Sequence, residues 1–77
     1  MRIISQDRKT NVPYEDNVFC IISDEDKKEH MIAVRNSNLT GFMPLGTYKE
    51  EKAALKVFED MSCAALSATN NYIYYLK

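Results

Sequence analysis

One stretch of this chain, and only one, has the apolar spacing of an amphipathic helix. Apolar residues recur on one side of a helical projection through 53–68, and charged residues occupy the other side. The pattern predicts a helix from about Glu50 to about Ser67. Residues 46–50 are expected to be a hinge into the helix, where Thr47 and Glu50 have the spacing of a capping box, although a start one turn later is equally compatible. A single helix covers one face of one sheet, so the other apolar segments must form that sheet.

The segments before and after this helix are short runs rich in β-branched and aromatic residues, separated by turn residues. The predicted strand segments are 2–6, 12–14, 17–23, 29–35, 39–45 and 72–76. Gly41 and Pro44 make the fifth of these irregular or place it at an edge. We therefore expect one α+β domain over residues 1–77, with a small antiparallel sheet of four to five strands (β-β-β-β-α-β) and the helix packed on one face.

Three of these segments are apolar at consecutive positions, namely Val18–Ile22, Met31–Val34 and Tyr72–Leu76. Successive side chains of a strand point to opposite faces, so such runs place apolar groups on both faces of the sheet. Because one helix covers only one face, we expect the other to meet a partner chain, most simply a second copy of the protein. Two alternatives remain open: a ligand groove, or burial by strand twist and tyrosine bulk within a monomer.

The two chain-terminal segments are the expected sheet edges. Pro13 has no amide hydrogen to donate, which confines the segment around it to an edge or a bulge. Edges and aromatic side chains are common components of protein interfaces. The interface candidates on these two segments are Val12, Tyr14, Tyr72, Tyr74 and Tyr75. We expect a homo-oligomeric protein-interaction module that acts on a second copy of itself or on a host protein.

A small-ligand binder is the competing class of function. Tyrosine rings provide stacking surfaces for a nucleotide base, and arginines contact phosphate. The residues assigned to that alternative are Arg2, Arg8, Arg35, Tyr72 and Tyr74. A protein that sequesters a nucleotide-like molecule between subunits would use them together.

Composition argues against most other classes of function. The formal charge of −1 disfavours nucleic acid as a partner, and residues 1–30 lack the long apolar run of a signal peptide or membrane span. We expect a cytoplasmic protein. Two cysteines and one histidine provide no zinc spacing, so neither a metal nor a cofactor is predicted. Cys63 has lysines nearby in sequence but no evident base, and we expect a protein without enzymatic activity.

The segments MRIISQDRKTNVPYE, GTYKEEKAALKVFEDM and YIYYLK together resemble a family of small uncharacterised proteins of Gram-positive bacteria and their prophages. Members of that family begin MRIISQD, continue through a VPYE-like segment and finish with a turn, a helix and a strand. This chain has Arg8-Lys9 where the family often has glycine. The resemblance implies a cytosolic, phage-derived accessory protein, in a setting where small proteins frequently inhibit or modulate a host protein.

Overall fold

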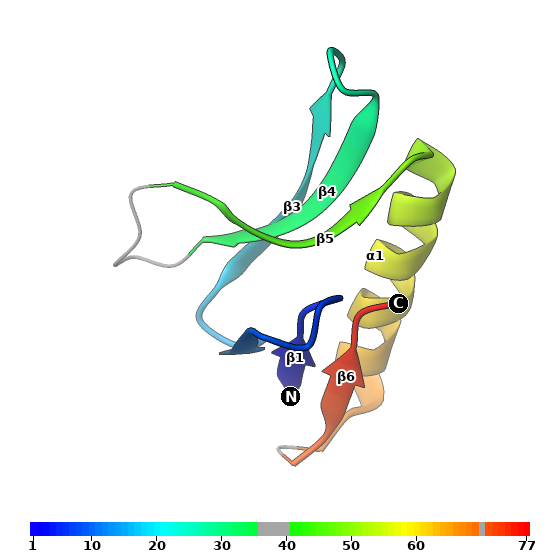
Figure 1. The fold of residues 1–77 in the computed structure, drawn as a ribbon. Coiled ribbons are helices and arrows are strands. Elements are labelled where there is room, and N and C mark those ends of the chain that lie inside the picture. Colours follow the sequence, from blue (N-terminus) through cyan, green and yellow to red (C-terminus); the bar gives the residue numbers. More distant parts are fainter. Residues whose placement is uncertain (36–40, 70) are drawn as a thin grey trace.

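The computed structural model describes residues 1–35, 41–69 and 71–77. The described residues form six strands and one helix (Figure 1), which confirms the α+β class. The elements in chain order are β1 (Arg2–Ile4), β2 (Asn11–Pro13), β3 (Val18–Asp24), β4 (Glu29–Arg35), β5 (Met43–Tyr48), α1 (Glu51–Ser67) and β6 (Ile73–Tyr75).

The strands form two sheets of three, which corrects the expectation of one antiparallel sheet. The first sheet, called sheet A, has the order β2-β1-β6, and the second, sheet B, has the order β3-β4-β5. A further correction is that β6 runs parallel to β1. The amide of Arg2 donates to the Tyr72 carbonyl at 2.9 Å, and the amide of Leu76 donates to the Ile4 carbonyl at 3.0 Å. Apolar alternation is the same in parallel and antiparallel strands, so it does not reveal strand direction.

The predicted hairpin of 17–23 with 29–35 is confirmed, because β3 and β4 pair without a register shift from Val18–Arg35 to Asp24–Glu29. The helix bounds are also confirmed within one residue, and of the two starts left open by the sequence the later one is found, without the Thr47 capping box. Thr47 belongs to β5, and the N-cap residue Glu50 makes no side-chain cap hydrogen bond.

The predicted strand 39–45 lies further along the chain, at Met43–Tyr48, and its first residues and the predicted turn at 36–38 fall outside the described residues. The shift has a clear cause in the pairing with β4. Ile32 lies opposite Gly46 and Ala33 opposite Pro44, so Leu45 is one extra residue that bulges. The bulge carries β5 on to Tyr48, through the segment expected to be a hinge.

Both sheets contribute to one hydrophobic core. Helix α1 packs against β3, β4 and β5, and Met61 of α1 is fully buried. The fully or nearly fully buried core residues are Met1, Ile3, Ile32, Val34, Leu45, Met61, Tyr74 and Leu76. Gln6 joins the two sheets. Its backbone N–H donates to the Leu45 carbonyl at 2.8 Å, and its side-chain Oε1 accepts from the backbone N–H of Thr47 at 3.0 Å.

The turn after β1 is held by a buried hydroxyl. Ser5 is 2% exposed, its Oγ donates to Asp7 Oδ1, and it accepts the Thr10 amide at 2.9 Å. Arg8 has φ of 67°, in the left-handed region that glycine adopts at least cost. An arginine at this position accepts a backbone cost on the order of 1 kcal/mol.

The Asp7 carboxylate makes part of the stability of the fold dependent on pH. The Ser5 hydroxyl and the Lys9 amide donate to it and hold its pKa below the ordinary value of 3.8. A lowered folded-state pKa contributes stability that is complete above 3.8 and is lost as the pH falls through the folded pKa. The Asp7→Asn variant should therefore lose less stability than wild type between neutral pH and about pH 3, measured by urea unfolding. Glu25→Gln at the exposed hairpin tip removes the same charge and serves as control; an equal effect of both would refute the assignment.

Candidate interaction surfaces

The last strand presents a different kind of surface on each of its two faces. Tyr74 is 6% exposed, and its hydroxyl donates to Asp60 Oδ2 of α1 at 2.6 Å. Burial, together with the Asp60 carboxylate, raises the pKa of the Tyr74 hydroxyl. Ile73 and Tyr75 on the other face are 43% and 51% exposed, and Tyr72 is 45% exposed. Of the three candidate tyrosines of this segment, the structure therefore leaves Tyr72 and Tyr75 open to a partner and places Tyr74 in the core.

The outer face of sheet A combines these apolar groups with arginines. Ile73 and Tyr75 lie opposite Arg2 and Ile4 in the parallel register, so the four side chains share one face. The Arg8 guanidinium lies 5.0 Å from the centroid of the Tyr75 ring and donates to the Leu76 carbonyl at 3.1 Å. Cation and ring hold each other in place, and the face remains partly exposed.

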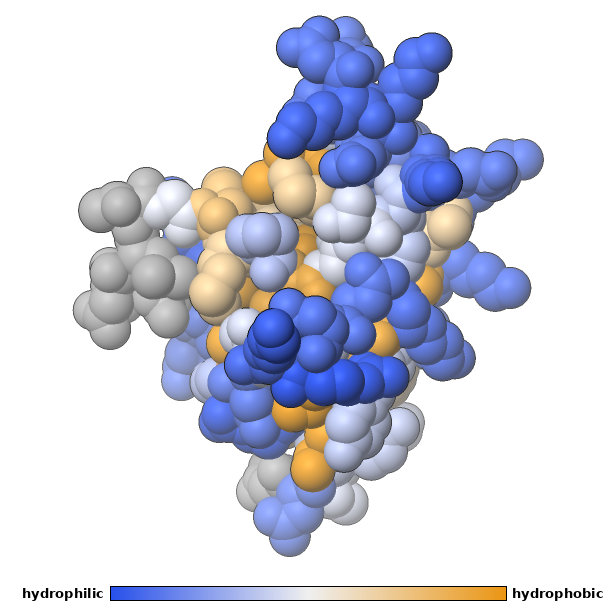
Figure 2. Space-filling view, in the orientation of Figure 1, coloured by the Kyte–Doolittle hydropathy of each residue, from blue (hydrophilic) through white to orange (hydrophobic). Residues whose placement is uncertain are grey.

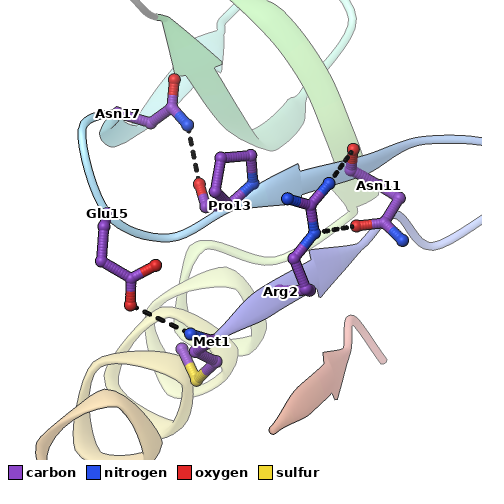
Figure 3. Close-up of polar contacts among 6 residues, drawn as sticks. All are labelled: Met1, Arg2, Asn11, Pro13, Glu15 and Asn17. Carbon is purple, nitrogen blue, oxygen red and sulfur yellow. Dashed lines mark hydrogen bonds and ion pairs between the residues drawn. The ribbon is translucent and has the colours of Figure 1, made fainter. Parts of the chain in front are cut away.

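Strand β2 is an edge of sheet A, as predicted, but side chains occupy its carbonyl groups (Figure 3). Arg2 donates from Nη2 to the Asn11 carbonyl at 3.3 Å and from Nε to Asn11 Oδ1 at 2.8 Å. Asn17 Nδ2 donates to the Pro13 carbonyl at 2.7 Å. Pro13 itself has no amide hydrogen, so this edge offers few free groups to another strand.

The two interface candidates on this side belong to the monomer's own packing. Val12 lies opposite Ile3 and is half-buried against the core. The Tyr14 ring stacks on Phe19 of β3, with centroids 5.3 Å apart. The amino group of Met1 pairs with Glu15 Oε1 at 3.0 Å and fixes the loop between β2 and β3 (Figure 3).

Strand β3 is an edge of sheet B, and among the described residues no side chain donates to its backbone carbonyl groups. Its seven residues pair with β4 alone and contain neither proline nor lysine. Val18 is 54% exposed, and the other four residues of the run through Ile22 are half-buried. In the central strand β4, by contrast, the corresponding residues Ile32, Ala33 and Val34 are all 1% exposed or less.

The contrast explains two of the apolar runs seen in the sequence. The apolar side chains of Met31–Val34 are covered within the monomer because β4 has a neighbouring strand on each side. The run Val18–Ile22, by contrast, lies on an open edge. On the face shown in Figure 2, hydrophobic residues gather below the hydrophilic tip of the β3–β4 hairpin. Sequence reasoning identified the β3 run but did not select its residues as site candidates, because only the strand order shows which run is at an edge.

The arginines proposed for phosphate binding are spread over both sheets. Arg2 lies on β1 of sheet A and Arg8 in the turn that follows β1. Arg2 already donates to the Asn11 side chain, and Arg8 to the Leu76 carbonyl. Arg35 ends β4 in sheet B, and its guanidinium lies 5.3 Å from the centroid of the Phe42 ring. Of the two proposed stacking rings, Tyr74 is buried and Tyr72 is exposed. The contacts of the described residues do not bring these groups together in one nucleotide site.

Two polar clusters on the described surface resemble catalytic groups in composition. Ser23 Oγ lies 2.7 Å from His30 Nδ1, and Glu51 Oε2 lies 4.0 Å from the same nitrogen. A nucleophile and an orienting acid must contact opposite nitrogens of a catalytic histidine, and here both approach one.

Cys63 is exposed in an open groove on α1, where Lys77 Nζ lies 3.8 Å from Asp60. Burial raises the pKa of the other thiol, Cys20, which keeps it protonated.

Comparison of the chain with protein-family models, curated proteins and solved structures finds no match. The resemblance to the prophage-associated family therefore stays a prediction. Within residues 1–35, 41–69 and 71–77, no helix is long and apolar enough to cross a membrane. No group of three or more acidic, cysteine or histidine side chains over these same ranges is placed to hold a metal ion.

Proposed function

We propose that this chain is a small non-enzymatic interaction module, which associates with itself and modulates a host protein. One observation carries the self-association: of the four outer strands of the two sheets, β2 and β3 differ in whether side chains occupy their free edge. Side chains occupy the edge of β2, whereas the longer and more apolar edge of β3 is left open. Natural monomers usually block long apolar edges, so an open one favours a partner strand.

The size of the chain supports the same proposal. A 77-residue chain buries roughly 60% of its unfolded surface, which leaves a lone monomer with marginal stability. Partner contacts that cover the half-buried side chains of β3 would add apolar burial at about 25 cal/mol per Å². The exposed group of Tyr72, Ile73 and Tyr75 on sheet A then remains as a separate surface for a host protein.

Solution mass tests the self-association directly. Light scattering from about 1 µM to about 1 mM should show a dimer or larger species that dissociates on dilution or persists throughout. Ile22→Lys places a charge on the outer side of the β3 edge and should shift the protein towards monomer, while circular dichroism stays native. Tyr75→Lys makes the same change on the outer face of sheet A and should leave the mass unaltered. A wild-type monomer across the whole range would contradict the proposal.

A further inference from the structure

We infer that the strand occupying the β3 edge is β3 of a second copy, paired antiparallel about a twofold axis at Ile21. The inference rests on the proposed self-association and specifies its partner and register. A twofold axis perpendicular to the sheet always pairs a strand antiparallel with itself, because the same patch contributes from both sides. The result is one continuous six-stranded sheet with the order β5-β4-β3 followed by the partner's β3, β4 and β5.

The register follows from the length of the strand. β3 runs from Val18 to Asp24, so an axis through its middle residue, Ile21, pairs all seven residues. Cys20 then lies opposite the partner's Ile22, and Val18 opposite the partner's Asp24. An axis at Cys20 would also pair the whole apolar run, but it would leave Ser23 and Asp24 without a partner residue in the strand, so Ile21 is the one position that pairs all seven.

Charge at the two ends of β3 favours this antiparallel pairing. At the Val18 end, the neighbouring residue on β4 is Arg35; of the two acidic residues just before this end, Glu15 pairs with the Met1 amino group and Asp16 is exposed. At the other end, the hairpin tip of residues 24–29 has four acidic residues and two lysines, which is a net charge of −2. Antiparallel pairing brings Arg35 of each copy towards the acidic tip of the other, so this attraction occurs twice in the dimer.

The pairs at the centre of this interface are apolar: Ile21 lies opposite the partner's Ile21 and Cys20 opposite the partner's Ile22, whereas Phe19 lies opposite the partner's Ser23. Phe19 and Ile21 face the core side of sheet B, and Cys20 and Ile22 face the opposite side. All four are half-buried in the single chain. A second β3 covers the open flank of both layers at once, which a ligand lying on one face of the sheet does not do. The second copy therefore accounts for the two-faced apolar run of this strand.

Disulfide trapping tests the partner and the register together. The residues opposite one another across paired strands have Cβ atoms about 4.5–5.5 Å apart, close to the distance a disulfide needs. The variant Ile22→Cys, made with Cys63→Ser, should form a covalent dimer with Cys20 of the partner subunit under mild oxidation. Cys63→Ser alone should not, because Cys20 then has only a diagonal neighbour at about 7–8 Å. Adding Cys20→Ser to the trapping variant should abolish the covalent dimer.

A charge pair at Val18 gives an independent measurement that leaves the core untouched. Val18→Asp faces the partner's Asp24 and should weaken dimerisation, whereas Val18→Lys faces the same carboxylate with the opposite charge. The dissociation constants should differ by about tenfold, because each dimer contains the pair twice. An oligomer that neither cross-links nor distinguishes these two variants overturns the β3 pairing and leaves the proposed function intact. A monomer at every concentration overturns both.

Discussion

Leu76→Ala is expected to lower the free energy of unfolding by about 2–5 kcal/mol, measured by urea denaturation. Leu76 is fully buried, in the core cluster shared by both sheets, so the substitution loses apolar burial and leaves a cavity. For a domain of this size the loss is a large part of the total stability. Leu66→Ala is the matched control, because Leu66 of α1 is 90% exposed and should change stability by less than about 0.5 kcal/mol. Equal losses at the two positions would show that the last residues are not in the core.

The cavity left by Leu76→Ala lies next to Gly46, which gives the same prediction a second measurement. A Cβ built on Gly46 would lie 2.9 Å from Leu76 Cδ2 and 3.1 Å from the Tyr48 hydroxyl, so Gly46→Ala overpacks the site. Shortening Leu76 removes the nearer of these two atoms. The double variant should therefore be more stable than the sum of the single effects predicts, by about 0.5–3 kcal/mol. Additive effects would contradict the contact.

Tyr74→Asp is expected to unfold the protein at neutral pH, whereas Tyr75→Asp should leave it folded. The Tyr74 substitution removes a buried ring and places a carboxylate against the core, close to Asp60. The expected loss is at least about 4 kcal/mol, near the limit for single substitutions. Tyr75 is the adjacent residue on the same strand and is 51% exposed, which makes it a close control. Circular dichroism and thermal melting of the two variants decide the matter, and similar melting temperatures would refute the assignment of the two faces.

Local patterns were sufficient to predict the helix and the β3–β4 hairpin. The apolar spacing of 53–68 and the two apolar runs around the polar tip are properties of neighbouring residues. The division into two sheets depends instead on which distant strands meet, and the parallel pairing of β6 with β1 has no local signature. The position of β5 depends on a bulge at Leu45 that fits it to β4, which is equally non-local.

For the candidate surfaces, too, local patterns predicted which residues are apolar but not which of them are exposed. Strand alternation alone implied that Tyr74 and Tyr75 face opposite ways, but only the strand order shows that Tyr74 faces the helix. The occupation of the β2 edge by Arg2 and Asn17 requires side chains from outside that strand. The open edge of β3 was within the apolar pattern of the sequence, yet the sequence contains an equally apolar run in β4, and nothing local separates the two.

The parallel pairing of β1 with β6 also determines when sheet A can be completed during folding. Residues 2–4 pair with residues 73–75, so nearly the whole chain forms the loop that this contact closes. Closing a long loop costs chain entropy before any contact compensates for it, and pairings between distant residues are slow. The β3–β4 hairpin needs only its own short turn. As the ribosome releases the chain, the β3–β4 hairpin with its open edge can therefore form before sheet A is complete.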